Sequence, residues 1–170
     1  MECEEPAGVN RRMGPERLGH LIDRHGAALE LAASQWCACP EDVVQAAFLK
    51  LSRLDREPEQ VAAWLYRVVR NAAVSAGRSE RRRQRHESAA GRKPWFTEES
   101  GGRLDGATAT AALAALEPDE RDAIIAHLWN GLTFEQIAEA LGVSTTTAHR
   151  RYIAGLNELR TRLKLPCPNP

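Results

Sequence analysis

The chain has 170 residues, enough for one domain or two small ones, and its 23 basic and 23 acidic side chains leave a formal net charge of zero. The total charge therefore gives no information about nucleic-acid binding, so the distribution of charge along the chain has to be read instead. No apolar run is long enough to span a membrane, and the first residues, acidic and then basic, do not form a secretion signal.

Leu, Ala, Arg and Glu dominate the composition, and no alternating run rich in Val, Ile and Thr occurs. This predicts an all-α protein. We expect two small helical domains, residues 15–87 and 107–165, after a disordered tail at 1–14. Residues 88–106 are rich in Gly, Ser and Pro and lack helical periodicity, which predicts a flexible linker between the domains.

Three helices are expected in the first domain, each opened by a proline at a position where its missing N–H costs nothing. The first runs from Pro15 to about Trp36, and the second begins at Pro40 with acids in its first turn. The third begins at Pro58, and helical spacing predicts a buried stripe made of Val61, Trp64, Leu65, Val68 and Ala72.

Residues 67–87 carry seven arginines against two glutamates, so this segment has a net charge of 7 − 2 = +5. Arginine offers a planar fork of donors that suits phosphates and bases, so the run predicts contact with nucleic acid. The alternative is a solvated helix face without a partner. The basic residues are Arg67, Arg70, Arg78, Arg81, Arg82, Arg83 and Arg85.

The second domain is expected to open with an Ala-rich helix over residues 107–116. Pro118 then begins another helix, with acids in its first turn. The apolar spacing of this helix turns Ile124, Ile125 and Leu128 inward.

A helix-turn-helix is predicted from residue 130 onwards. Thr133 and Gln136 have the spacing of a capping box, Gly142 suits a left-handed helix end, and Ser144 caps the next helix. The second helix places Ala148, Tyr152 and Leu156 on one stripe, and its other face is polar and basic. An ordinary pair of core helices is the alternative. The exposed face is Thr145, Thr146, His149, Arg150 and Ile153.

Taken together, the two halves resemble the extracytoplasmic-function sigma factors of bacterial RNA polymerase, over roughly residues 16–87 and 107–164. The first half resembles region two, and the second resembles region four. The matching segments are 41–45 (EDVVQ), 48–51 (FLKL), 63–67 (AWLYR), 70–71 (RN), 114–116 (AAL), 131–138 (GLTFEQIA), 141–144 (LGVS) and 147–151 (TAHRR).

The resemblance implies a non-enzymatic, cytoplasmic protein that directs core polymerase to promoters without a cofactor. Region two would read and open the minus-ten element, and region four would read the minus-thirty-five element. The implied polymerase-binding residues are Asp42, Gln45 and Phe48. An anti-sigma protein is a further candidate partner. The implied DNA-binding residues are Arg67, Arg70, Asn71, Arg78, Arg81, Arg82, Arg83, Thr145, Thr146, His149, Arg150 and Arg151.

Two other classes of function stay open at this point. A conventional helix-turn-helix regulator would bind a palindromic operator as a dimer. A small enzyme or metal protein would use Cys37, Cys39 and His25, although the cysteines lack a second ligand pair at metal spacing, so no metal is expected. No phosphate-binding glycine loop and no nucleophile with a neighbouring base is found in the sequence, so catalysis is not expected.

Overall fold

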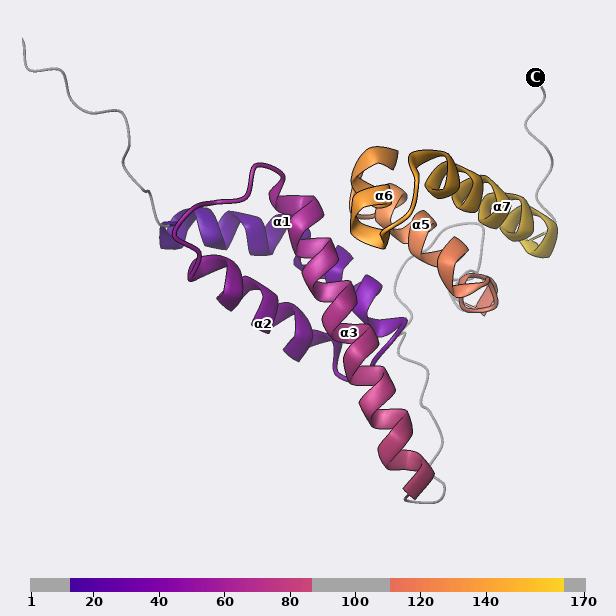
Figure 1. Ribbon diagram of the computed structural model, residues 1–170, viewed down its shortest axis with the longest axis horizontal. Helices are drawn as coiled ribbons and strands as arrows, with labels where there is room; N and C mark the ends of the chain where they lie inside the picture. Colours follow the sequence, from indigo (N-terminus) through magenta and orange to yellow (C-terminus); the bar gives the residue numbers. More distant parts are fainter. Residues whose placement is uncertain (1–12, 87–110, 164–170) are drawn as a thin grey trace, which may run out of the picture.

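The computed structural model describes residues 13–86 and 111–163, and every regular element in these two ranges is a helix (Figure 1). The all-α prediction is confirmed. The predicted linker, residues 1–12 of the predicted tail and residues 107–110 of the expected Ala-rich helix lie outside the described residues. Within the described part of that expected helix, residues 111–114 are helical. The helices are α1 (Pro15–Ser34), α2 (Pro40–Ser52), α3 (Val61–His86), α5 (Pro118–Leu128), α6 (Phe134–Leu141) and α7 (Thr145–Leu163).

Helices α1, α2 and α3 pack against one another, and prolines open α1 and α2 as the sequence predicts. Helix α3 begins three residues later than expected, because residues 59–60 form a turn and the Trp64 amide donates to the Gln60 carbonyl at 3.0 Å. Just before this turn, Arg17 of α1 binds the Glu57 carboxylate with an Nε–Oε2 distance of 2.9 Å. This contact between α1 and the loop lies where the chain turns into α3.

The predicted buried stripe of α3 was right for Leu65, but in place of Val68 and Ala72 the buried positions lie one residue further along the helix. Leu65, Val69 and Ala73 are fully buried, whereas Val68 is half-buried and Ala72 is exposed. Apolar side chains cover more than one face of this helix, so spacing alone left its rotation open. The observed rotation also buries Tyr66, which packs where α3 meets the second half of the chain.

Helix α5 is the centre of the second half, and Ile124 and Ile125 are fully buried in it as predicted. The prediction for Leu128 was wrong: its side chain is 53% exposed, because α5 ends at this residue and the apolar stripe continues no further. Helix α7 packs closely on α5 through Gly155. A Cβ atom at this glycine would lie 2.7 Å from Cδ1 of Ile124.

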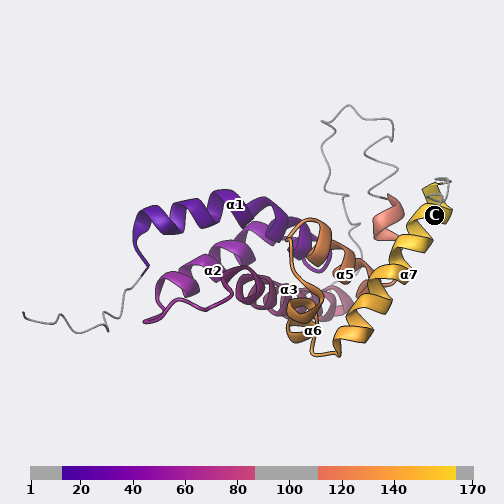
Figure 2. The same ribbon diagram turned by 90° about the horizontal axis from the view of Figure 1, so that it is seen from above.

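The two halves of the chain contact each other. Helix α6 lies against α3 and α5 against α1, while α7 lies on the far side of α5 (Figure 2). Among residues 13–86 and 111–163, no helix has both the length and the apolar character needed to cross a bilayer.

Candidate nucleic-acid and polymerase-binding surfaces

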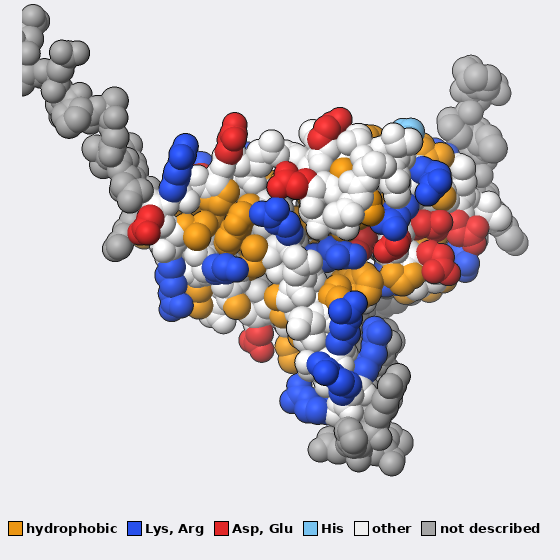
Figure 3. Space-filling model, viewed as in Figure 1, with side chains coloured by type: hydrophobic (Ala, Val, Ile, Leu, Met, Phe, Trp, Pro, Cys, Tyr) orange, Lys and Arg blue, Asp and Glu red, His pale blue; other side chains and the backbone are white. Residues whose placement is uncertain are grey.

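The C-terminal end of α3 carries an exposed arginine cluster, made of Arg78, Arg81, Arg82 and Arg83. This end extends beyond the other helices, and Figure 3 shows the basic side chains gathered over it. Such a projecting set of positive charges can approach the phosphates of a nucleic acid without a clash from the other described helices. Asn71, which lies about two helical turns before Arg78, is also exposed.

Arg67 and Arg70 lie on the same helix but are engaged by acids from the second half of the chain. Arg70 Nε lies 2.6 Å from Oδ2 of Asp122, and its side chain is 19% exposed. Arg67 Nη1 lies 3.0 Å from Oε1 of Glu139, in a more exposed pair. The structure thus separates the predicted DNA-binding arginines of α3 into an exposed cluster and an ion-paired set.

Asp122 is the centre of a buried polar node between the two halves. Its side chain is 2% exposed and accepts a second hydrogen bond from Trp36 Nε1 at 3.0 Å, while its backbone carbonyl accepts one from the Tyr66 hydroxyl at 3.1 Å. Burial raises the pKa of Asp122 above its ordinary value, and the neighbouring Arg70 guanidinium opposes this shift. Burial also raises the pKa of Tyr66 well above its ordinary value.

Arg121 completes this node from the α5 side. Its guanidinium lies 6.0 Å from the centre of the Trp36 ring, and its Nη1 donates to the Ala114 carbonyl at 3.0 Å. Its Nε is buried without a hydrogen-bond partner among the described residues. Burial lowers the pKa of Arg121, so the surroundings disfavour its charge.

The helix-turn-helix has the local structure that the sequence predicts. Thr133 and Gln136 form both hydrogen bonds of a capping box, Gly142 is left-handed with φ of 67°, and Ser144 Oγ accepts from the Thr147 amide at 3.2 Å. These three features set where each helix begins and ends. The resulting turn directs the first residues of α7 towards solvent.

The predicted reading face of α7 is exposed at Thr145, Thr146, His149 and Arg150. Arg151 is half-buried, and its guanidinium lies 2.6 Å from Oδ2 of Asp119 on α5. Four of the five predicted α7 residues therefore share an open surface, and the fifth is tied to the helix behind it.

An aromatic cluster behind this face escaped the sequence analysis, apart from its member Tyr152. Phe134 at the start of α6 stacks on the His127 ring, with centroids 4.6 Å apart, and meets the ring of His149 edge-on at 4.9 Å. Tyr152 contacts both His127 and Phe134. In the sequence, these ring contacts are indicated only by the presence of an aromatic side chain on each of the three successive helices α5, α6 and α7. The cluster supports His149 from behind, so it orients one residue of the reading face.

The predicted polymerase-binding residues of α2 divide into exposed and buried ones. Asp42 and Gln45 are exposed on one side of the helix. Phe48 is 4% exposed and belongs to the core, so it does not share the exposed side of Asp42 and Gln45. Burial of this aromatic side chain stabilises the packing of α2 against its neighbours, and its predicted role in polymerase binding stays a prediction.

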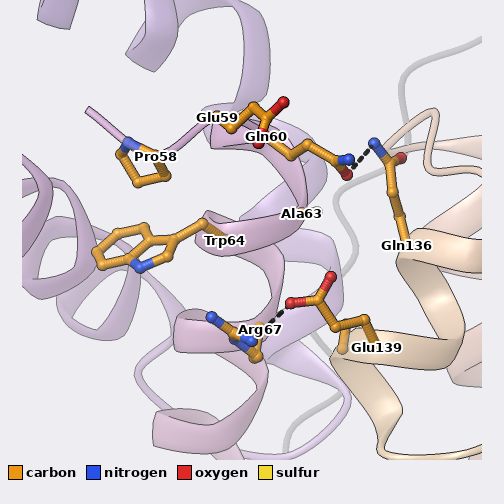
Figure 4. A pocket seen from close by; sticks show the side chains of 9 residues that line it. Pro58, Glu59, Gln60, Ala63, Trp64, Arg67, Gln136 and Glu139 are labelled. Atoms are coloured by element: carbon orange, nitrogen blue, oxygen red, sulfur yellow. Dashed lines mark hydrogen bonds and ion pairs between the residues drawn. The ribbon is translucent and has the colours of Figure 1, made fainter. Parts of the chain in front are cut away.

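A polar groove runs between α3 and α6, lined by Trp64 and Arg67 on one wall and Gln136 and Glu139 on the other (Figure 4). A hydrogen bond from Gln136 Nε2 to Gln60 Oε1 of 2.7 Å crosses the groove near one end, and the Arg67–Glu139 ion pair crosses it further along. The groove therefore lies on the boundary between the two halves.

Cys37 and Cys39 are free thiols. Burial raises the pKa of Cys37 and also lowers that of His25, which keeps both side chains mostly uncharged near neutral pH. In the part of the chain that the structure describes, no group of three or more His, Cys, Asp or Glu side chains is placed to hold a metal ion.

Comparison with known proteins gives matches in both halves. Residues 21–83 match the family "Sigma-70 region 2", and residues 108–159 match "Sigma-70, region 4". The chain is 34% identical over 135 residues to "RNA polymerase sigma factor CarQ" of Myxococcus xanthus, a match that covers 74% of this chain and 75% of that protein.

Two solved structures share the fold. The sigma factor RpoE of Bartonella quintana, in complex with the anti-sigma factor NepR, has a TM-score of 0.76 at 24% identity, over 89% of this chain and 99% of that one. CnrH, in complex with the cytosolic domain of CnrY, has a TM-score of 0.61 at 22% identity, over 89% of this chain and 90% of that one.

Proposed function

Since this chain belongs to the sigma-70 family, in its extracytoplasmic-function subfamily, and is an RNA polymerase sigma factor, we propose that its two helical domains divide promoter recognition between them. Residues 15–87 form the domain that reads and opens the minus-ten element. Residues 107–165 form the domain that reads the minus-thirty-five element. Members of this family bind core polymerase and promoter DNA and are not enzymes, and we place the action of this protein in the cytoplasm, with the polymerase.

The minus-ten role is supported by the charge and placement of α3. Arg78 and the exposed arginines at 81–83 would hold phosphates, because they project from the protein on one rigid helix. Arg67, Arg70 and Asn71 would approach the separated strands, where unstacked bases need donors and stacking surfaces. Trp64, half-buried in the groove next to Arg67, adds an aromatic surface to this region.

The minus-thirty-five role is supported by the exposed face of α7. Thr145 and Thr146 lie in the first turn, where free backbone N–H groups favour a phosphate. His149 and Arg150 lie one turn further along and would reach base edges in the major groove. Arg151 would contact the backbone after exchanging its Asp119 partner for a phosphate.

Polymerase binding is assigned to the exposed side of α2. Asp42 and Gln45 lie three residues apart, so both side chains can meet one partner surface. An anti-sigma protein is a candidate second partner, because the structural relative RpoE was solved with a protein of that class.

The proposal rests chiefly on one observation: both family matches occur on one chain, in order, with 34% identity to a sigma factor across most of its length. The test is transcription in vitro from a library of randomised promoters, using core polymerase with and without this protein. Specific start sites that appear only with the protein are expected. Binding of DNA by the protein alone as a dimer, with no effect on the polymerase, would show a conventional regulator instead.

A further inference from the structure

We propose that Cys37 and Cys39 form a redox-active dithiol, which a low-molecular-weight disulfide converts into an intramolecular disulfide, and that this oxidation weakens the binding of core polymerase. The first step concerns only the chemistry of the connection between α1 and α2. The second step rests on the proposed function, because it concerns the side of α2 that is assigned there to the polymerase.

The spacing of the two cysteines suits a disulfide. They lie in the short connection between α1 and α2, with only Ala38 between them. Two residues of fully extended chain span at most about 7 Å from Cα to Cα, and the bend at Ala38 shortens this distance. A disulfide joins Cα atoms that are about 4.4–6.8 Å apart. The connection therefore holds the two cysteines close to the separation that the bond needs.

The Cys37 thiol is half-buried and is held next to Cys39. Its Sγ lies 3.5 Å from the Ala33 carbonyl oxygen, to which the thiol donates, and it accepts a hydrogen bond from the backbone N–H of Cys39. Burial raises the pKa of Cys37, and the nearby carboxylates of Glu80 and Glu41 act in the same direction. Cys37 is therefore the sheltered, protonated member of the pair.

The Cys39 thiol is the accessible member. Cys39 is exposed and is the N-cap residue of α2, but its side chain makes no capping hydrogen bond. Ser, Thr, Asp and Asn are the residues that stabilise this position through such a bond, so the start of the helix does not account for a cysteine here. The sulfur can meet a dissolved oxidant, and it can turn towards Cys37 without the loss of a cap.

The oxidant is a small disulfide, for which oxidised glutathione is the probe. The Cys39 thiolate attacks one sulfur of the probe and forms a mixed disulfide, and the glutathione thiolate that leaves takes up the proton lost by Cys39. Cys37 then gives up its proton and attacks the Cys39 sulfur, which releases a second glutathione as a thiol. The two cysteines lose two electrons in total, and one glutathione disulfide is reduced to two thiols.

Closure of this bond displaces the α2 side of the connection, because the α1 side is fixed. The Cys37 amide donates to the Ala33 carbonyl at 3.1 Å. The Trp36 carbonyl oxygen packs so closely on α3 that a Cβ atom at Gly77 would lie 2.0 Å from it. Cys39 is exposed, so the adjustment falls on this residue and on the first turn of α2 that follows it.

The displaced turn belongs to the proposed polymerase-binding side of α2. Asp42 follows Cys39 by three residues, which is about one helical turn, and its side chain is exposed. A shift of this turn moves the Asp42 carboxylate relative to Gln45 and so spoils their joint fit to one partner surface. A ring closed over a single intervening residue is strained and easily reduced, which makes the effect reversible.

The test uses the full-length protein with Cys3→Ser and Cys167→Ser, which leaves Cys37 and Cys39 as its only cysteines. This parent protein is treated with oxidised glutathione and then with dithiothreitol. A thiol-reactive dye and the intact mass report the state of the cysteines, and circular dichroism melts establish that the protein is folded. Competition with a labelled sigma factor measures the affinity for core polymerase. Cys37→Ser and Cys39→Ser in the same background are the matched controls.

We expect the oxidant to remove both thiols of the parent protein and to leave no glutathione attached. The affinity for core polymerase should fall by more than about 2-fold, beyond the usual effect of a surface change, and dithiothreitol should restore it. Cys37→Ser should retain glutathione on Cys39, because no second thiol is present to release it. Cys39→Ser should form no intramolecular disulfide and keep its affinity.

Thiols that survive the oxidant, or glutathione that stays on the parent protein, would overturn the dithiol. An intramolecular disulfide that leaves the affinity unchanged would overturn its effect on polymerase binding. A reduced protein that does not bind core polymerase at all would instead contradict the proposed function, and the reduced samples report this separately.

Discussion

Replacement of Gly77 by alanine tests how α3 is held against the end of α1. A Cβ atom at this position would lie 2.0 Å from the Trp36 carbonyl oxygen and 3.1 Å from its carbon. Real Cβ contacts stay beyond 3.0 Å, so a backbone carbonyl would have to move by at least 1 Å. Overpacking of this kind typically costs about 1–3 kcal/mol, and here backbone rather than a flexible side chain has to move.

Alanine also favours a helix over glycine by about 1 kcal/mol, which offsets part of this cost. We therefore expect Gly77→Ala to lower the free energy of unfolding by about 1–2 kcal/mol, with a fall in Tm of roughly 2–8 °C for a chain of this size. Chemical denaturation and thermal melts followed by circular dichroism measure both quantities.

Gly19→Ala in α1 is the matched control, because a Cβ atom there would meet no atom within 4 Å. This variant gains helix propensity without a clash, so it should be more stable than the native protein by about 0.5–1 kcal/mol. The two substitutions are chemically identical and are expected to have opposite signs. Equal stabilisation by both would refute the close approach of α3 to Trp36.

Three further variants test the assigned surfaces. Asp42→Lys should weaken pull-down of core polymerase while it changes stability by about 0.5 kcal/mol or less, because the residue is exposed; undiminished pull-down would remove α2 from the interface. Replacement of Arg81 and Arg82 by alanine should weaken binding to all promoters alike. It should also reduce the slope of log affinity against log salt by about 0.9 for each lost phosphate contact. An unaltered slope would show that these arginines face solvent and do not contact phosphates. Arg150→Ala should change the bases selected from a randomised minus-thirty-five library, where a bidentate contact to guanine contributes about 1–3 kcal/mol, whereas an even loss of affinity across sequences would make Arg150 a phosphate contact.

The local structure of the helix-turn-helix could be predicted because each signal acts over a few residues. Thr133 and Gln136 satisfy each other's backbone groups within one turn, and Ser144 does the same for Thr147. Gly142 takes its left-handed conformation because glycine has no Cβ atom that would clash there, which depends on no other residue. The exposed residues of α7 follow from its boundaries and period, so this candidate surface could also be predicted.

Assignments within α2, α3 and α5 followed less completely from the sequence, for a common reason. Phe48 lies in the core, Leu128 lies on the surface, and the buried face of α3 is centred on Leu65 and Val69. Helices α2 and α3 carry apolar residues on more than one side, and α5 ends at Leu128, the last residue of its apolar pattern. Periodicity identifies such a segment as a helix, but only the neighbours that pack against it decide which side is covered.

The pairing of charges was decided by the tertiary structure alone. The sequence places Arg70 in a basic run and Asp122 among the acids near the start of another helix, 52 residues further along the chain. Each assignment is locally correct, and neither indicates that the two side chains meet at 2.6 Å in a buried node. An ion pair over such a separation depends on how α3 and α5 pack, because only that packing removes both groups from water and brings them together.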